Sequence, residues 1–191
     1  GKVDLPAPDV FFGNDKMEVT DTDIYKSEQA FTQGQMITVT GIDNLNEWWI
    51  DPDFFEKQSD GALKFLPING DYRVTANAVL KYFSVMALKD GKPAKLQDDG
   101  TGAIWAIGKG IGKPSVTSSE VGWEPSKALC LAQVASKKYQ LTLKAGETLK
   151  TSGDPEVISF KFFHQNDWGG EFGNYASSIL VEQLKLADSG N

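Results

Sequence analysis

Short stretches of alternating hydrophobic and polar residues recur along the chain, and turn-forming residues separate them. A period of two is typical of a strand with one buried face, and no long helical periodicity competes with it. The Asn69-Gly70 dipeptide favours a tight hairpin. The pattern predicts strands at residues 17–20, 36–40, 62–66, 72–75, 80–87, 103–107, 128–134, 139–143, 156–163 and 179–186. The expected fold is all-β, built of antiparallel β-sandwich modules of immunoglobulin-like or carbohydrate-binding-module-like type.

A weak internal repeat suggests how the modules are divided. Residues 37–41 resemble 104–108, and residues 70–75 resemble 137–142 at the same offset. We therefore expect two sandwiches in tandem, at residues 35–98 and 99–191. Pro6 and Pro8 exclude a regular helix from residues 1–34, which we expect to form an extended lead-in.

Composition narrows the class of partner. The net charge of −7 disfavours nucleic acid and anionic membranes, which select clustered Lys and Arg. The single cysteine, Cys130, cannot form an intramolecular disulfide. No apolar run reaches the roughly 20 residues of a membrane span. The chain starts at Gly1-Lys2 rather than at Met, which fits a trimmed precursor from which a leader or lipid anchor has been removed.

The five tryptophans divide into two groups by their surroundings. Trp105 lies in an apolar strand, which favours a core position. The other four lie among polar and turn residues, where recognition residues concentrate: Trp48, Trp49, Trp123 and Trp168. A flat indole packs against the apolar face of a pyranose ring while neighbouring polar groups bond its hydroxyls. Because adjacent residues of a strand face opposite ways, at most one of Trp48 and Trp49 need be buried.

The residues around Trp168 supply polar groups suited to a sugar site. His164 is the single histidine, so a multi-histidine zinc site is excluded, and we expect neither metal nor cofactor. Cys130 lies between two leucines and reads as an inert buried thiol rather than as a nucleophile paired with His164. The predicted ligand-binding site lies at Trp168 with Lys161, His164, Gln165, Asn166 and Asp167, or at the Trp48–Trp49 pair.

Two other interpretations remain open. Asp51, Asp53 and Glu56 could supply the facing carboxyls of a glycoside hydrolase or lyase, about 5–10 Å apart, although Asp51-Pro52-Asp53 is more typical of a turn. The tryptophans and their neighbouring aromatic residues could also form the core of a structural or adhesive domain with no glycan ligand.

The glycine-rich segment 108–114 lacks the spacing of a phosphate loop and indicates a strand leaving into a loop.

The second module also resembles a known family. Its Ile104-Trp-Ala-Ile-Gly108, Gly122-Trp123, Tyr139-Gln-Leu-Thr142, Phe160-Lys-Phe-Phe163 and Trp168 follow an order similar to that of the SusE and SusF type of starch-binding outer-membrane lipoproteins of gut Bacteroidetes. The first module, with Trp48 to Phe55 and Gly70 to Thr75, resembles the paired module of their relatives. This resemblance implies a lipid-anchored protein at the bacterial cell surface that captures glycan, without cleaving it, for an outer-membrane transporter complex. It carries Trp123 and Trp168 over as the module's aromatic residues. Such modules end in further strands, so the second is expected to be truncated or to continue beyond Asn191.

Overall fold

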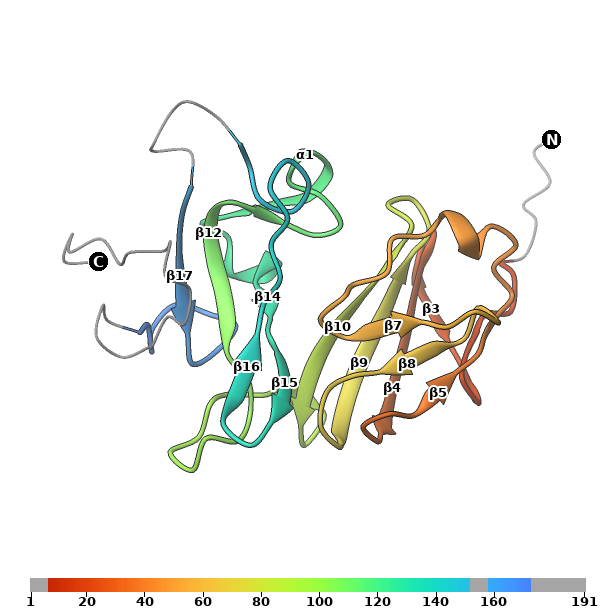
Figure 1. Ribbon diagram of the computed structural model, residues 1–191, viewed down its shortest axis with the longest axis horizontal. Coiled ribbons are helices and arrows are strands. Elements are labelled where there is room, and N and C mark those ends of the chain that lie inside the picture. Colours follow the sequence, from red (N-terminus) through yellow and green to blue (C-terminus); the bar gives the residue numbers. More distant parts are fainter. Residues whose placement is uncertain (1–6, 152–157, 173–191) are drawn as a thin grey trace.

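The computed structural model describes residues 7–151 and 158–172, which form two β-rich lobes side by side (Figure 1). We call them the N-terminal module, β1 to β11, and the C-terminal module, β12 to β17. The helical elements in these residues are single turns: α1 (Val116–Ser119), η1 (Leu45–Glu47) and η2 (Pro125–Lys127). Every strand pairing within the sheets is antiparallel, which confirms the all-β prediction. No helix of the described residues is long and apolar enough to cross a membrane.

The N-terminal module is a sandwich of one large sheet against smaller ones. The large sheet has the order β11-β10-β9-β4-β3 and consists of β3 (Glu18–Asp21), β4 (Ile24–Phe31), β9 (Gly70–Asn77), β10 (Tyr82–Lys89) and β11 (Lys92–Pro93). Opposite it lie β5 (Met36–Ile37), β7 (Phe55–Lys57) and β8 (Leu63–Phe65), and a second small sheet of β1 (Phe11–Phe12), β2 (Asp15–Lys16) and β6 (Val39–Thr40).

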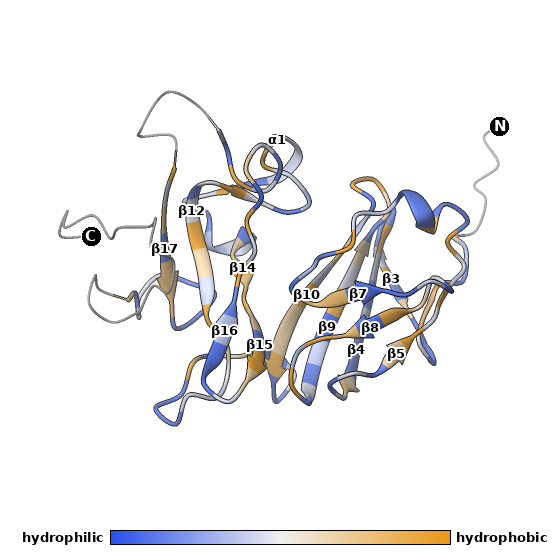
Figure 2. Cartoon of the chain, in the orientation of Figure 1, coloured by the Kyte–Doolittle hydropathy of each residue, from blue (hydrophilic) through white to orange (hydrophobic). Residues whose placement is uncertain are grey.

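Aromatic side chains fill the space between these sheets. Phe31 stacks on Phe65 with ring centroids 4.8 Å apart, and Phe12 meets Phe83 edge-on at 5.3 Å. Along β10, Phe83 and Val85 are buried in this core, whereas the alternate residues Tyr82 and Ser84 face away from it. The hydropathy colouring shows the same alternation on the strands (Figure 2). The face of the large sheet that carries Tyr82 and Ser84 is thus not part of this core.

The C-terminal module is arranged around β12 (Trp105–Gly112). Strand β17 (Ser159–Phe163) pairs along one edge, and β13 (Glu120–Gly122) and β14 (Leu129–Cys130) pair along the other. A hairpin of β15 (Ala132–Ala135) and β16 (Lys138–Gln140) completes the module. The glycine-rich segment is therefore largely a central strand, which corrects the expectation that it leaves into a loop. Gly108 is required because a Cβ there would lie 2.3 Å from the Cα of Phe160.

Three further expectations from the sequence are wrong. Residues 1–34 are not only a lead-in, because β4 pairs with β9 from Ile24–Asn77 to Phe31–Gly70. Asn69-Gly70 is not a hairpin turn, since β8 and β9 belong to different sheets; the Asn69 side chain instead accepts a bond from the Gln33 amide. The repeat does not reflect equivalent strands, because residues 70–77 form a central strand and residues 138–140 one arm of a hairpin. The strand expected at 179–186 lies outside the described residues.

The two modules share buried surface and backbone bonds. Ala132 of β15 belongs to the core of the N-terminal module. The Ile68 amide donates to the Gln133 carbonyl at 2.9 Å, and the Gln33 side chain donates to the Val134 carbonyl at 2.9 Å. Figure 1 shows β15 lying beside β10 at this junction. Strand β15 is therefore one of the structural links between the lobes.

Candidate functional sites

Two exposed tryptophans meet on the C-terminal module. Trp123 follows β13, and Trp168 lies in the loop after β17; their rings stack with centroids 6.3 Å apart and planes at 27°. They approach from opposite edges of β12, since Gly122 and Phe160 both pair with Gly108. Trp123 is 37% exposed and Trp168 49%, so the pair forms an aromatic surface open to solvent.

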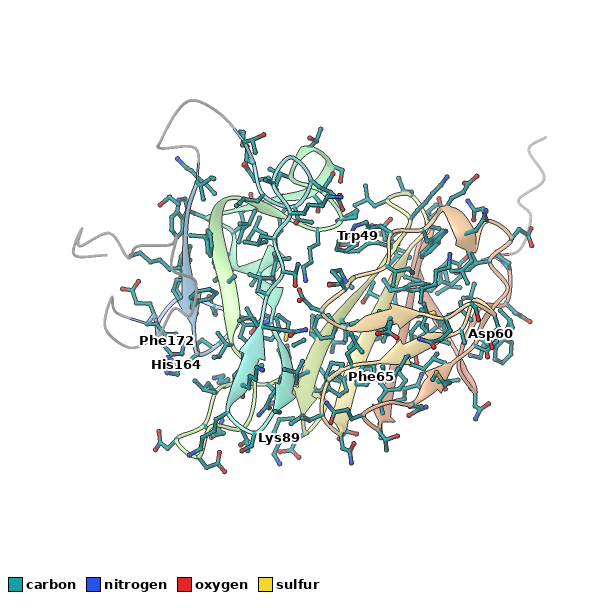
Figure 3. All side chains as sticks on the ribbon, viewed as in Figure 1. Trp49, Asp60, Phe65, Lys89, His164 and Phe172 are labelled. Atoms are coloured by element: carbon teal, nitrogen blue, oxygen red, sulfur yellow. The ribbon has the colours of Figure 1, made fainter. Side chains whose placement is uncertain are left out.

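The loop that carries Trp168 is held by its own polar groups. The His164 amide and ring both bond the Gly170 carbonyl, and the His164 ring stacks on Phe172 at 4.3 Å (Figure 3). The Gln165 side chain donates to the Trp168 carbonyl, and Asp167 accepts from the Trp168 amide at 2.7 Å. Trp168 is thus presented by a loop that is already ordered, which lowers the entropy lost on binding.

The other polar residues predicted around Trp168 have different surroundings. Lys161 of β17 pairs with Glu171 at 3.1 Å. Asn166 is half-buried and Asp167 exposed. The structure therefore brings Trp123, Trp168, Asn166 and Asp167 to one end of this module, with His164, Gln165 and Lys161 acting mainly as supports of the loop and its strand.

The Trp48–Trp49 pair does not form a second platform. Trp48 is 6% exposed and packs on Phe83 at 4.7 Å, so its indole belongs to the N-terminal core and is withdrawn from the ligand site. Trp49 is half-buried at the junction, where its Nε1 donates to Glu147 Oε1 of the other module at 2.7 Å. Trp105 is 1% exposed and donates to the Ala94 carbonyl, which confirms its predicted place in the core.

The carboxylates of Asp51 and Asp53 are buried against a lysine of the other module. Lys113 Nζ lies 2.7 Å from Asp51 Oδ2 and 2.9 Å from Asp53 Oδ2, and all three side chains are at most 6% exposed. Thr142 adds an amide and a hydroxyl bond to Asp53. Asp51-Pro52-Asp53 forms a turn, in which the Phe55 amide bonds the Asp51 carbonyl at 2.9 Å.

This ion triad, defined as Asp51, Asp53 and Lys113, has the chemistry of a link between modules. Burial raises the pKa of the Asp51 carboxyl against the opposing pull of Lys113. Burial also acts to lower the pKa of Lys113, but its two carboxylate partners outweigh that effect and raise it. Sequence reasoning missed Lys113, because a buried lysine carries no local pattern that separates it from an exposed one.

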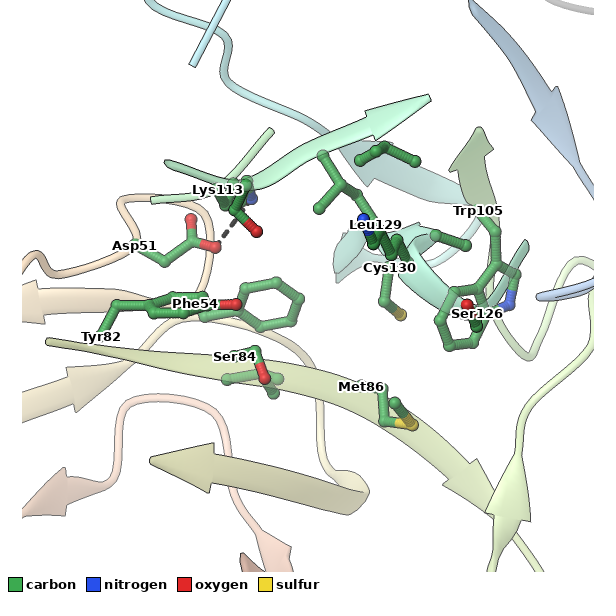
Figure 4. A pocket seen from close by; sticks show the side chains of 15 residues that line it. Asp51, Phe54, Tyr82, Ser84, Met86, Trp105, Lys113, Ser126, Leu129 and Cys130 are labelled. Carbon is green, nitrogen blue, oxygen red and sulfur yellow. Dashed lines mark hydrogen bonds and ion pairs between the residues drawn. The ribbon is translucent and has the colours of Figure 1, made fainter. Parts of the chain in front are cut away.

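A cavity of about 240 Å³ lies beside this triad, between the modules (Figure 4). Its walls come from both modules and combine apolar, aromatic and hydroxyl-bearing side chains. They include Phe54, Tyr82, Ser84 and Met86 from the first module, and Trp105, Ser126, Leu129 and Cys130 from the second. Sequence reasoning did not anticipate it, because its lining residues are far apart along the chain.

The chain matches two different protein-family models, one for each module. Residues 5–96 match the family described as Domain of unknown function (DUF5125), and residues 99–191 match Domain of unknown function (DUF5121). Each family model thus matches one of the two modules. The DUF5125 match covers the strands of the N-terminal module, and the DUF5121 match begins just before β12. No curated protein and no solved structure matches the chain.

Proposed function

We propose that this tandem protein binds carbohydrate without cleaving it, at the surface formed by Trp123 and Trp168. The observation that carries the proposal is the exposed, stacked indole pair, in which Trp168 is held by hydrogen bonds within its loop. An exposed aromatic surface of this kind offers an apolar face to the C–H groups of a sugar ring at little entropic loss. Asn166 and Asp167, beside Trp168 in the loop, supply hydrogen-bonding groups for the hydroxyls.

The non-catalytic part of the proposal is supported by the carboxylates. A glycoside hydrolase needs two carboxyl groups that face the substrate across the scissile bond. Asp51 and Asp53 instead face Lys113 in a buried turn, and Glu56 lies apart on β7 with an exposed side chain. The carboxylates that the sequence singled out thus favour a structural role over hydrolysis.

We place the protein at the bacterial outer surface, anchored by lipid in its precursor, beside an outer-membrane glycan transporter. This part rests on the resemblance to SusE- and SusF-type lipoproteins. An open aromatic surface fits such a role, because capture before transport calls for weak, reversible binding. We expect a Kd in the micromolar to millimolar range, as is common for single shallow sites.

Affinity gel electrophoresis with immobilised starch, xylan, mannan, β-glucan and mucin tests the proposal. We expect at least one polysaccharide to retard the protein. Changing both Trp123 and Trp168 to alanine should abolish retardation. Aromatic side chains that become buried at the centre of a binding surface each contribute about 2 kcal/mol or more to the binding free energy. The control is Val79→Ala, which trims an exposed apolar side chain of the other module. Retardation by no polysaccharide, or retardation that survives the double change, contradicts the proposal, and release of reducing sugar would contradict its non-catalytic part.

A further inference from the structure

The cavity between the modules has a floor made by one strand. Tyr82, Ser84 and Met86 alternate along β10 with residues buried in the N-terminal core, so their side chains point toward the C-terminal module. Figure 4 shows them facing Leu129, Cys130 and Trp105 across the cavity. The floor belongs to a strand that is paired with β9 from Tyr82 to Leu88.

The cavity carries hydroxyl groups that the protein itself does not use. In the part of the chain that the structure describes, no protein hydrogen bond engages the hydroxyls of Tyr82, Ser84 or Ser126, all of which line the cavity. None of the described side chains has a fully buried polar atom without a partner. The hydroxyls of Tyr82 and Ser84 are therefore not fully buried, and Ser126 is exposed. Burial raises the pKa of Tyr82, so its phenol stays protonated and can donate.

Charge and size narrow the class of ligand. Lys113 is held between two buried carboxylates, and Lys127 at the rim has Glu124 3.5 Å away, so each ammonium already has a carboxylate partner. Phe54, Trp105 and Leu129 supply apolar walls. At about 240 Å³, the cavity is below the roughly 300–1,000 Å³ that hold drug-sized ligands. These features fit one small, neutral ring that has apolar faces and several hydroxyls.

We propose that the cavity between the modules binds a single neutral sugar unit, through the hydroxyls of Tyr82, Ser84 and Ser126 and the apolar wall that includes Leu129. The inference shares its ligand class with the function proposed above and rests on it to that extent, but it concerns a separate site. The Trp123–Trp168 surface would hold a stretch of polysaccharide, and the cavity would hold a monosaccharide or a chain end.

Two-dimensional NMR of the isotope-labelled full chain, titrated with neutral monosaccharides, tests the site. Glucose, galactose, mannose, xylose and N-acetylglucosamine are the probes, and glucuronic acid is the anionic comparison. We expect at least one neutral sugar to shift the amides of Tyr82 and Ser84 and the Trp105 indole. Glucuronic acid should shift them less.

Variants separate this site from the tryptophan pair. Ser84→Leu fills the cavity and should weaken monosaccharide binding by at least about tenfold, equivalent to about 1.4 kcal/mol. The matched control is Thr75→Leu, the register partner of Ser84 on the neighbouring strand, which does not line the cavity. Tyr82→Phe and Ser126→Ala remove one hydroxyl each without added bulk and should weaken binding by about three- to tenfold. The double alanine change at Trp123 and Trp168 should leave the cavity shifts intact.

The outcomes are distinct. The inference is overturned if no neutral sugar shifts the cavity residues, if the shifts survive Ser84→Leu, or if glucuronic acid is the stronger ligand. If no neutral sugar shifts the cavity residues but polysaccharide still retards the protein through its tryptophan pair, only this inference is overturned. If a neutral sugar shifts the cavity residues but no polysaccharide retards the protein, the inference is supported and the function proposed for the tryptophan pair is contradicted.

Discussion

Lys113 places one ammonium group between two carboxylates of the other module, and all three charges are buried. Removing one member of such a group leaves the others uncompensated, which lowers the free energy of unfolding by about 3–5 kcal/mol. We expect Lys113→Met to have this effect in urea denaturation. Lys127→Met, which removes an exposed partner of Glu124, should change stability by less than about 1 kcal/mol. Equal stability of the two variants would show that the triad adds nothing to the fold.

Cys130 is the only cysteine; it lines the cavity and packs in a small apolar cluster with Ala94, Ala103 and Trp105. Burial raises the pKa of its thiol to about 12. Because the thiolate is the reactive form, we expect iodoacetamide to alkylate the native protein at pH 8 at least about 100-fold more slowly than the protein unfolded in guanidinium. Mass spectrometry follows the reaction. Similar rates in the two states would mean that the thiol is exposed.

At the scale of elements, the close approach of β17 to β12 depends on Gly108. Its φ of 147° and the 2.3 Å distance from a Cβ to the Phe160 Cα both disfavour alanine. We expect Gly108→Ala to lower the free energy of unfolding by about 3 kcal/mol or more, as for other backbone strain and overpacking. Gly146→Ala is the matched control, because φ is also positive there but no atom lies within 4 Å; it should lose only about 1–2 kcal/mol. Similar losses of unfolding free energy in the two variants would mean that the positive φ accounts for the effect, and not the close approach to Phe160.

The alternating pattern predicted β9 and β10 because each has one buried face, whereas β12, which is buried on both faces, was indicated by its apolar residues. It could not give their partners, since a period of two identifies the face of a strand but not its neighbour. Strands β1 and β2 were missed because each is only two residues long, whereas β3 overlaps the strand predicted at residues 17–20. The same limit applies to the sites. The polar, turn-rich surroundings of Trp123 and Trp168 identified both as candidate binding residues. Their stacking, the triad and the cavity could not be predicted, because they depend on pairings between distant segments.

At the scale of the whole molecule, the fold favours the protonated forms of several buried or half-buried groups. The pKa values of Cys130 and Tyr139 are raised by burial to about 12, and that of Lys113 is also raised, by its carboxylate partners. A group whose pKa is higher in the folded than in the unfolded state stabilises the fold fully at pH values below its unfolded pKa. This stabilisation is lost as the pH rises through its folded pKa. We therefore expect the urea midpoint to fall steadily above about pH 9. A urea midpoint that stays constant or rises up to pH 11 would contradict the predicted loss of stability.

The modules should unfold together rather than in sequence. Domains joined by small polar interfaces move and unfold independently, but here β15 contributes to the N-terminal core and the ion triad crosses the junction. Unfolding the C-terminal module alone would expose Asp51 and Asp53 without Lys113 and strip Ala132 from the N-terminal core. We expect circular dichroism and tryptophan fluorescence to give coincident single transitions, as two-state unfolding requires. Hydrogen exchange provides the decisive measurement, because the amides of Phe83 in β10 and Ile107 in β12 should exchange with the same free energy. In Lys113→Met the two values should separate, with Ile107 exchanging first; unequal values in the unaltered protein would mean that the modules are independent.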